Sequence, residues 1–468
     1  MLIPFAARVS AYTIPYETWM GAYVAQKKVG YMSLKIDKGE FNGVKGYRMA
    51  NVLSNRLTVL GTELTQLVTA VVYTDEKQVP LSEEFAMSSG GKTTRVRATF
   101  TPSTVECVVS AGSGSSVKSV PIPQGAKLVA DAMFAVDAPP PKIGERQLMH
   151  YFNPLTLSID ELDVTAEREE KLTLGGKEYT TIVIKSVTPL GEMTLWQEPD
   201  GDVLQVKAMM GITLLRESKQ QAIKGIGEGS ADDFAVLTSV KPNRPIASPR
   251  QCRTLEAVLT GLEDESMRIS DSRQKAALID GNPGKTRFLI NGSSFDESRS
   301  LVRPLAGAGF EDELASTPYI DYDMPEVAKQ AREIVGEERN AYAACSKIRE
   351  WVHANMKTRT DIGITRSASD VLESKEGVCR DYAILFAALA RAAGIPTRIA
   401  AGLTYTDGAF YYHAWNECYV GEWVPFDATL AQDFVDATHI KLAQGDATCM
   451  YGLARVIGTL KIDVKSTK

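Results

Sequence analysis

The segment EGVCRDYAILFAALARAAGIP, Glu376–Pro396, decides the fold of the C-terminal part of the chain. It sets Cys379 ahead of an alanine-rich run that is typical of a helix, and Gly394 and Pro396 predict where that helix ends. A helix N-terminus favours an anion by roughly 0.3–1 kcal/mol, which is less than one pKa unit. Cys379 therefore needs a histidine from elsewhere in the sequence if it is to react as a thiolate.

Helical spacing precedes this segment, and strand-like runs follow it. Apolar residues recur at helical spacing after Met324-Pro325 and again through Cys345, Ile348 and Val352. The strand-like runs lie at 397–404, 410–420 and 423–427. Helices followed by antiparallel strands predict an α+β domain.

The first half of the chain has the alternation of half-buried strands. Between Val29 and Asp37, the apolar Met32, Leu34 and Ile36 share one face. Similar runs occur at 56–60, 69–73, 94–100, 105–109 and 181–187, and turn residues at 198–202 predict a hairpin between residues 195 and 208. Residues 111–119 and 139–141 predict loops within the same region. We therefore expect a large antiparallel β-rich domain.

The length of 468 residues predicts two or three domains. The clearest boundary lies near Lys241–Arg250, where three prolines in ten residues interrupt any regular element. We therefore expect an N-terminal β-rich domain at 1–240, a β-rich connecting segment at 241–318 and a catalytic domain at 319–468.

The histidine that Cys379 needs is best supplied by His413. It stands in a strand-like run, Tyr411–Tyr419, and shares a strand face with Trp415. After the turn at Gly421-Glu422, a second strand-like run ends at Asp427, and neighbouring antiparallel strands can bring this carboxylate beside His413. The other three histidines fit less well: His353 as a packed or surface residue, His150 in the strand-rich half, and His439 in a loop-like tail.

Three motifs occur in the order cysteine, histidine, aspartate. They are G-x-C-x-[DE] at Gly377–Asp381, [YF]-H-x-W-x-E at Tyr412–Glu417, and D-x-T at Asp427–Thr429. Together they resemble the transglutaminase-like superfamily, relatives of papain-type thiol enzymes, over roughly residues 319–445. The resemblance implies a C-terminal papain-like domain of a bacterial multidomain protein. It also implies Cys379 as nucleophile, His413 as general base and then acid, and Asp427 as the group that orients the imidazole.

The same resemblance raises expectations for neighbouring residues. Some family members use a tryptophan upstream of the cysteine as an oxyanion donor, whereas this sequence has Met356-Lys357-Thr358, so that donor is unassigned. We expect Trp415 to wall the site and Glu417 to pair with a neighbour. Asp381 is expected to be a helix N-terminal charge or a salt-bridge partner, and Cys418 a core residue.

The function implied is acyl transfer through a cysteine thioester on peptide or protein carboxamides. The acceptor is water in a protease or amidase and an amine in a transglutaminase; hydrolysis is slightly favoured. The alternative is a catalytically silent binding or scaffolding protein with the same fold. We expect a protein or peptide substrate, no cofactor and no metal, because the Cys, His and Asp positions are widely separated and lack an evident fourth ligand.

Composition limits the classes of molecule that the protein is expected to bind. The net charge of −6 gives no basic footprint and argues against nucleic acid. No run approaches the roughly 20 apolar residues of a membrane span, so we expect a soluble chain, and the six scattered cysteines argue against a zinc ribbon. The opening MLIPFAARVSAY is either a truncated signal peptide, implying a periplasmic or extracellular protein, or an ordinary segment of a cytoplasmic one. The oligomeric state is open.

Overall fold

The computed structural model describes residues 14–111, 114–130, 140–227, 233–305, 309–430 and 432–468. Two compact units are distinguished: an N-terminal unit of residues up to 110 with 115–234, and a C-terminal unit of residues 235–468 with the short stretch 111–114. Residues 241–318 thus lie in the same unit as 319–468, and the expected three-part division stays a prediction. The possible signal-peptide remnant lies outside the described residues.

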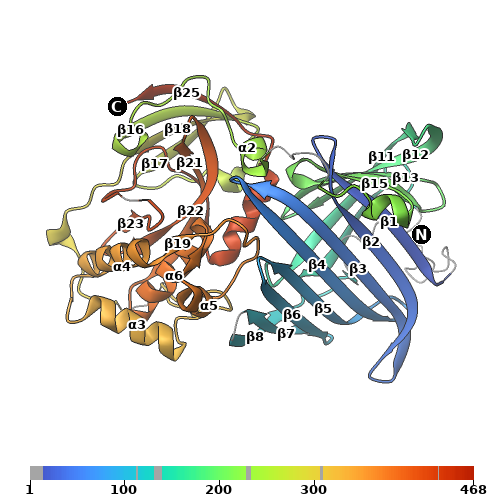
Figure 1. Ribbon diagram of the computed structural model, residues 1–468, viewed down its shortest axis with the longest axis horizontal. Helices are drawn as coiled ribbons and strands as arrows, with labels where there is room; N and C mark the ends of the chain where they lie inside the picture. Colours follow the sequence, from blue (N-terminus) through green and yellow to red (C-terminus); the bar gives the residue numbers. More distant parts are fainter. Residues whose placement is uncertain (1–13, 112–113, 131–139, 228–232, 306–308, 431) are drawn as a thin grey trace. The chain divides into compact units, whose positions relative to one another are not determined.

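The N-terminal unit is built on one sheet in the order β8-β7-β6-β5-β4-β3-β2-β1-β15-β14-β13-β12-β11-β10-β9 (Figure 1). Strands β1 to β6 and β10 to β15 pair antiparallel with their neighbours, β1 pairs with β15, and β9 pairs parallel with β10. The strands are β1 Tyr16–Val24, β2 Lys27–Phe41, β3 Val44–Val59, β4 Thr62–Asp75, β5 Pro80–Ser89, β6 Lys92–Phe100, β7 Thr104–Ala111, β8 Gly114–Pro121, β9 Leu128–Val129, β10 Arg146–Asn153, β11 Ser158–Leu174, β12 Lys177–Thr188, β13 Gly191–Gln197, β14 Val203–Lys207 and β15 Ile212–Arg216.

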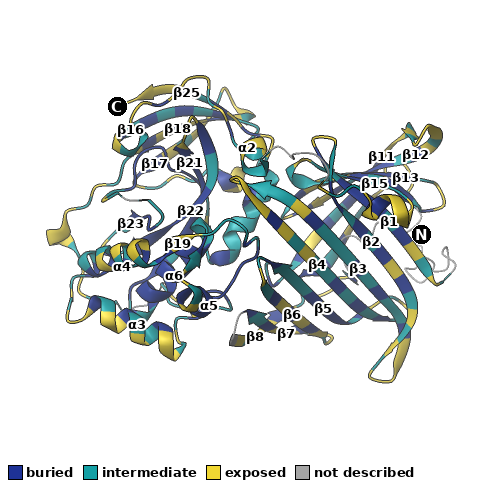
Figure 2. Ribbon diagram, viewed as in Figure 1, coloured by how far each residue is buried: buried dark blue, intermediate teal, exposed yellow. Residues whose placement is uncertain are grey.

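The alternation seen in the sequence is what places these strands. In β2 the side chains of Met32, Leu34 and Ile36 are buried while their neighbours are more exposed, and Figure 2 shows the same alternation along the long strands. The hairpin expected between 195 and 208 is present as β13 and β14. The loop expected at 111–119 is wrong for its second part, because residues 114–121 form β8 despite their glycine and serine content.

The C-terminal unit combines the expected helices and strands. Its helices are α3 Pro325–Val335, α4 Ala341–Asn355, α5 Ala368–Ser374 and α6 Cys379–Ala392; the short α1 Lys219–Ile223 belongs to the N-terminal unit, and the short α2 Phe234–Thr238 begins at the boundary. One sheet has the order β23-β22-β21-β24, from β21 Thr397–Thr406, β22 Ala409–Tyr419, β23 Trp423–Phe426 and β24 Ile440–Gly445. A two-strand pair, β19 Lys357–Thr358 and β20 Glu376–Gly377, leads into α6. The predicted α+β character of this region is thereby confirmed.

A further sheet of the same unit has the order β17-β18-β16-β25, from β16 Thr254–Thr260, β17 Gln274–Ile279, β18 Asn282–Asn291 and β25 Lys461–Thr467. The last strand of the chain therefore pairs with the first strand after the proline-rich stretch. Apolar residues of this sheet pack with residues of β21 and β24 in one core, among them Leu255, Phe288, Leu403 and Ile440. The β-rich segment after residue 250 is thus joined to the sheet that carries His413.

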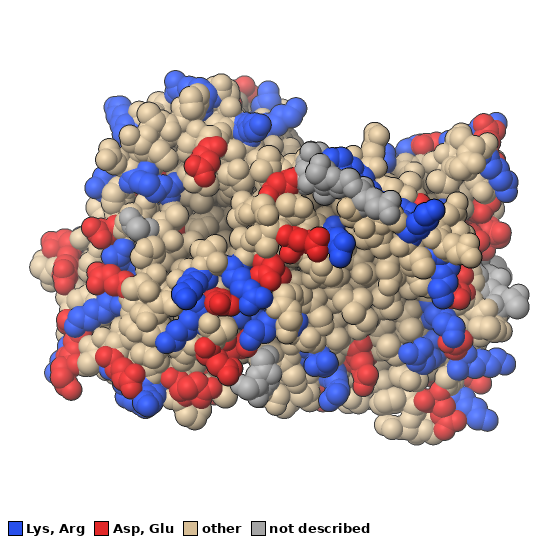
Figure 3. All heavy atoms as spheres, viewed as in Figure 1, with Lys and Arg blue, Asp and Glu red and all other residues tan. Residues whose placement is uncertain are grey.

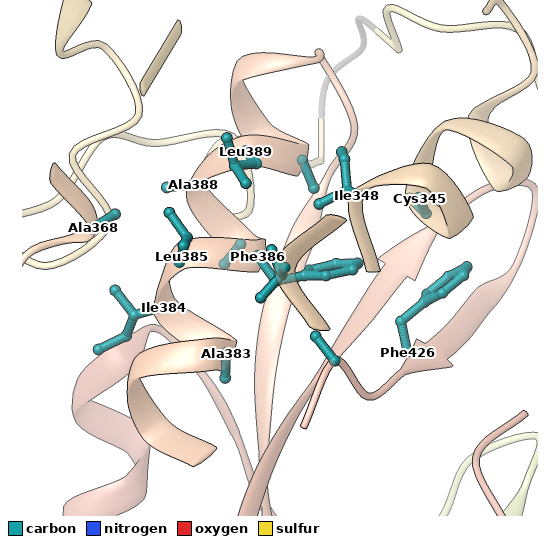
Figure 4. Close-up of a cluster of buried hydrophobic side chains, with 14 of the residues drawn as sticks. Cys345, Ile348, Ala368, Ala383, Ile384, Leu385, Phe386, Ala388, Leu389 and Phe426 are labelled. Carbon is teal, nitrogen blue, oxygen red and sulfur yellow. The ribbon is translucent and has the colours of Figure 1, made fainter. Parts of the chain in front are cut away.

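Helix α6 lies at the centre of the other large core of this unit (Figure 4). Its residues Ala383–Ala390 are all buried, and they pack with Ile348 of α4, Val371 of α5 and Phe426 of β23. The alanines let the neighbouring helices and the sheet approach the helix axis closely. This packing fixes the position of Cys379 at the N-terminal end of α6.

Charges of both signs are interspersed over the face of the molecule seen in Figure 3, as the modest net charge predicts. Within the described part of the chain, no helix combines the length and the apolar character needed to cross a membrane.

Candidate active site

The start of α6 is built around the side chain of Asp381. Its Oδ2 accepts a hydrogen bond from the backbone N–H of Val378 at 2.9 Å, which satisfies a donor just ahead of the helix. A Cβ on Gly377 would lie 2.5 Å from both Cβ and Oδ2 of Asp381, so only glycine fits there. The spacing of Gly377, Cys379 and Asp381 thus has a physical basis: the glycine leaves room for the aspartate that caps the turn carrying the cysteine.

Asp381 is in turn held by Arg366. The two are fully buried, with Nη2 of Arg366 3.2 Å from Oδ1 of Asp381. The same guanidinium donates to Oγ of Ser374 at 2.8 Å and to the backbone carbonyl of Glu376. Both roles expected for Asp381, helix N-terminal charge and salt-bridge partner, are confirmed.

His413 lies in the middle of β22, opposite Gly402 of β21. Strand β23 pairs with β22 only from Asn416 to Tyr419, so the stretch around His413 lies beyond the paired part. Asp427 follows directly after β23, and its Oδ2 lies 2.8 Å from Nε2 of His413. Its Oδ1 accepts from the backbone N–H of Thr429 at 2.7 Å. The antiparallel pairing expected from the sequence therefore does bring Asp427 beside His413.

Cys379 is partly exposed, and His413 is the neighbour that most lowers the pKa of its thiol. Burial by itself would raise the pKa of the Cys379 thiol. The hydrogen bond and charge of His413, the backbone N–H of Ala414 and the charge of Arg380 outweigh burial and lower this pKa below its ordinary value.

The pKa values of His413 and Asp427 are shifted in the directions that favour their charged forms. Burial by itself would lower the pKa of His413, but the charge of Asp427 and hydrogen bonds to Asp427 and Cys379 raise it to about 10. Burial would raise the pKa of Asp427, but His413 and His439 hold that pKa well below its usual range. The arrangement therefore favours a thiolate beside an imidazolium, with an ionised carboxylate behind the ring.

His439 is the residue of this site that sequence reasoning missed. The expectation of a loop-like tail is wrong for the residues that follow it, because β24 begins at Ile440 and pairs with β21. The side chain of His439 is fully buried, and its Nε2 lies 3.2 Å from Oδ2 of Asp427. Asp427 thus has two imidazole neighbours. The buried apolar residues Ile440 and Leu442 were the signal that could have indicated a strand.

Neighbouring residues lie as expected. The ring of Trp415 stacks on that of His413 with centroids 6.2 Å apart, and its buried indole N–H has no acceptor among the described residues. Glu417 pairs with Arg398 at 2.8 Å and with Lys441 at 2.7 Å. Cys418 is fully buried in the core around α6. Trp415 therefore walls the histidine by packing, and Glu417 is a structural ion-pair partner.

Two of the histidines that were expected to fit less well, and the segment upstream of the cysteine, have other surroundings. His353 is in α4, with Nδ1 3.0 Å from the carbonyl oxygen of Ala428, and His150 is in β10 of the N-terminal unit. The segment Met356–Thr358, upstream of the cysteine, runs beside the start of α6, since Thr358 pairs with Gly377 in β19 and β20. Its residues Met356–Thr358 offer no indole donor.

One group in the described part of the chain has the composition of a metal site: His413, Asp427 and His439, whose ligand atoms lie within 4.8 Å of one another. Both Nε2 atoms face the same carboxylate oxygen at 2.8 and 3.2 Å. A proton on each nitrogen accounts for both contacts as hydrogen bonds.

A thiol, an imidazole and a carboxylate in hydrogen-bonded series form the arrangement of thiol-dependent acyl-transfer enzymes. Residues 328–428 match the model of the transglutaminase-like superfamily, and this part of the chain is a transglutaminase-like domain. The match supports a transglutaminase-like function at the level of that family. No curated protein matches the sequence.

Solved structures give weaker likenesses. A candidate cysteine protease from Cytophaga hutchinsonii is 19% identical with a TM-score of 0.31, over 46% of this chain and 86% of that one. A candidate protease from Parabacteroides distasonis is 13% identical with a TM-score of 0.20, over 77% and 69% of the two chains. TM-scores this low do not establish a shared fold.

Proposed function

We propose that the chain is a thiol-dependent acyl-transfer enzyme acting on carboxamides of peptides or proteins, with Cys379 as nucleophile, His413 as general base and acid, and Asp427 as the group that orients the imidazole. The observation that carries the proposal is the 2.8 Å contact between Nε2 of His413 and Oδ2 of Asp427, on a ring that also lowers the pKa of the Cys379 thiol at the start of α6. The lowered pKa of Cys379 supports it, because the thiolate is the nucleophilic form.

In the acylation step the Cys379 thiolate attacks the carbonyl carbon of a glutamine side chain or a peptide bond. As the first residue of α6, Cys379 has a backbone N–H without an intrahelical acceptor, which is suited to stabilise the developing oxyanion. His413 then gives its proton to the leaving nitrogen as the C–N bond breaks. Ammonia or an amine leaves, and a thioester remains on Cys379.

In the second step water or a primary amine attacks the thioester carbonyl. His413 takes the proton of the attacking group, the C–S bond breaks, and the thiolate returns beside the imidazolium. With water the product is a carboxylic acid, and with an amine it is a new amide. We favour hydrolysis, which makes the enzyme a cysteine peptidase or amidase, and keep amine transfer as the second branch.

The experiment uses two acyl donors with the full chain: p-nitrophenyl acetate and a glutamine-containing peptide with and without a primary amine. We expect an acetyl thioester on Cys379, found by mass spectrometry, and a peptide product that is cleaved, deamidated or joined to the amine. Cys379→Ala abolishes both, whereas the matched Cys345→Ala, a buried thiol of α4, keeps both.

The competing reading is a catalytically silent binding or scaffolding protein. It predicts that wild-type protein and Cys379→Ala behave alike with both donors. Equal labelling of the two proteins by p-nitrophenyl acetate, together with unchanged peptide, overturns the enzymatic proposal.

A further inference from the structure

We propose that His439 is a positioning residue of this site, which fixes the carboxylate of Asp427 so that Asp427 can hold the ring of His413. The proposal rests on the proposed function, in which Asp427 orients His413. It assigns a role to a buried histidine that none of the three motifs contains.

The imidazole of His439 bridges two aspartates. Its Nε2 lies 3.2 Å from Oδ2 of Asp427, and its Nδ1 lies 3.2 Å from the backbone oxygen and 3.4 Å from Oδ1 of Asp436. The hydroxyl of Thr404 is 3.5 Å from Nε2. His439 and Asp436 are fully buried, and the Asp427 side chain is nearly so. Each ring nitrogen thus faces oxygen atoms that need a donor.

The turn that carries His439 is anchored from the segment before the catalytic helices. The buried guanidinium of Arg273 donates from Nη2 to the backbone oxygen of His439 at 2.6 Å. Nη1 of Arg250 lies 2.9 Å from Oδ2 of Asp436, and Oδ1 of Asp436 accepts from the backbone N–H of Thr438 at 2.8 Å. The ring of His439 is therefore held from both its backbone and its far nitrogen.

The His439 ring lies where it can fix the orientation of the Asp427 carboxylate. Oδ1 of Asp427 accepts from Thr429, and Oδ2 accepts from both His413 and His439. Donors on both oxygens allow one orientation of the carboxylate and favour its ionised form. The ring of His439 also meets that of Trp415 edge-on, with centroids 5.3 Å apart, which closes the site behind His413. His439 acts on the chemistry through Asp427.

Two isosteric substitutions separate the two sides of the ring. In His439→Gln the amide nitrogen replaces Nε2 and keeps a donor for Asp427, whereas in His439→Asn it replaces Nδ1 and keeps only the contact with Asp436. The readout is the rate of iodoacetamide reaction at Cys379 between pH 5.5 and 9, with EDTA present so that no metal occupies the two imidazoles. His150→Gln, in the N-terminal unit, controls for loss of a histidine.

We expect His439→Asn to slow alkylation near pH 6 roughly 10-fold and to move the pH profile upward, since a hydrogen bond to a charged group is lost. His439→Gln should stay within about 2-fold of the wild type, as the same bond is retained. If the turn has a purely structural role, His439→Gln should slow alkylation of Cys379 as much as His439→Asn does, or more. Either result overturns the proposal. Unchanged rates in both variants also overturn it.

A measurement on the wild-type protein removes the dependence on variants that fail to fold. With the histidine rings labelled with ¹⁵N, a hydrogen-bonded Nε2–H signal of His439 is expected, and its absence overturns the proposal. Failure of the proposed function looks different: the wild-type Cys379 would then react no faster than Cys379 in His413→Gln. In that case His439 variants have no activated thiol to modulate, and the inference falls together with the function.

Discussion

The most deeply buried ion pairs among the described residues lie in the C-terminal unit and not in the N-terminal one. In the N-terminal unit, pairs such as Lys171 with Glu178 lie on an exposed strand surface, where the lysine side chain is 71% exposed. In the C-terminal unit, Lys441 is only 1% exposed and lies within 2.7 Å of Glu417 and 2.6 Å of Asp271. An exposed pair contributes little, whereas a buried charge is tolerated only when it is fully paired.

The difference matters because the buried charges of the C-terminal unit surround the candidate site. Glu417 lies two residues after Trp415 on β22, and Lys441 lies two residues after His439. Arg366 and Asp381 hold the start of α6 from the other side. Alternation alone explains the sheet of the N-terminal unit, but the site depends on pairs that form only when distant segments meet.

The largest expected effect is on stability, and it distinguishes the buried Lys441 from the exposed Lys171. Lys441→Met takes from the partly buried Asp271 the only cation that pairs with it among the described residues, and it takes one of two from the buried Glu417, which keeps Arg398. We therefore expect the free energy of unfolding to fall by about 3–5 kcal/mol. Lys171→Met removes an exposed pair in the N-terminal unit and should leave the unfolding transition unchanged. Differential scanning calorimetry measures both. Similar shifts in the two variants would show that burial does not distinguish the pairs.

The β-rich fold of the N-terminal unit could be predicted from the sequence, whereas the buried ion pairs around the candidate site could not. Alternation predicts the long strands, and motif spacing predicts that His413 and Asp427 meet across β22 and the end of β23. Burial of Lys441 could not be predicted, because a lysine is normally exposed and its partner Asp271 is far away in the sequence. The contact of His439 with Asp427 could not be predicted either, because His439 lies outside the three motifs, just before β24, and meets Asp427 only in the folded chain.

The glycine of the first motif offers a second, smaller contrast. In Gly377→Ala the new Cβ would meet Asp381 at 2.5 Å and disturb the cap that holds Cys379, so we expect a loss of about 1–3 kcal/mol. Gly61→Ala in the N-terminal unit has nothing within 4 Å, and its positive φ of 76° should be the only strain, about 1 kcal/mol. Urea unfolding gives both values, and iodoacetamide rates report the position of Cys379.

The outcome of that pair tests the explanation of the motif. If Gly377→Ala is no more destabilising than Gly61→Ala and Cys379 reacts normally, the close approach of Asp381 is not the reason for glycine at this position. If the stability loss is larger and thiol reactivity falls with it, the cap and the nucleophile are linked through the turn at Val378.

The smallest expected effect concerns two thiols, one in each unit. The lowered pKa of Cys379 means that its thiolate persists as pH falls below the ordinary range near 8.5, and the raised pKa of His413, about 10, keeps the ring protonated up to that pH. The ion pair therefore exists between these two pKa values. Burial raises the pKa of Cys107 in the N-terminal unit to about 12, so this thiol should stay unreactive over the same range.

His413→Gln turns this contrast into a measurement. Without the imidazolium the pH profile of Cys379 alkylation should move up toward that of a free thiol. The rate at pH 6.5 should fall roughly 10-fold, because the variant holds less thiolate at that pH; the fall is limited because a thiolate of higher pKa is the stronger nucleophile. Peptide mapping after iodoacetamide treatment gives the rates of both cysteines. A wild-type profile with its midpoint at or above 8.5, or modification of Cys107 at a comparable rate, would mean that His413 does not activate the sulfur of Cys379, because burial alone acts on both thiols in the same direction.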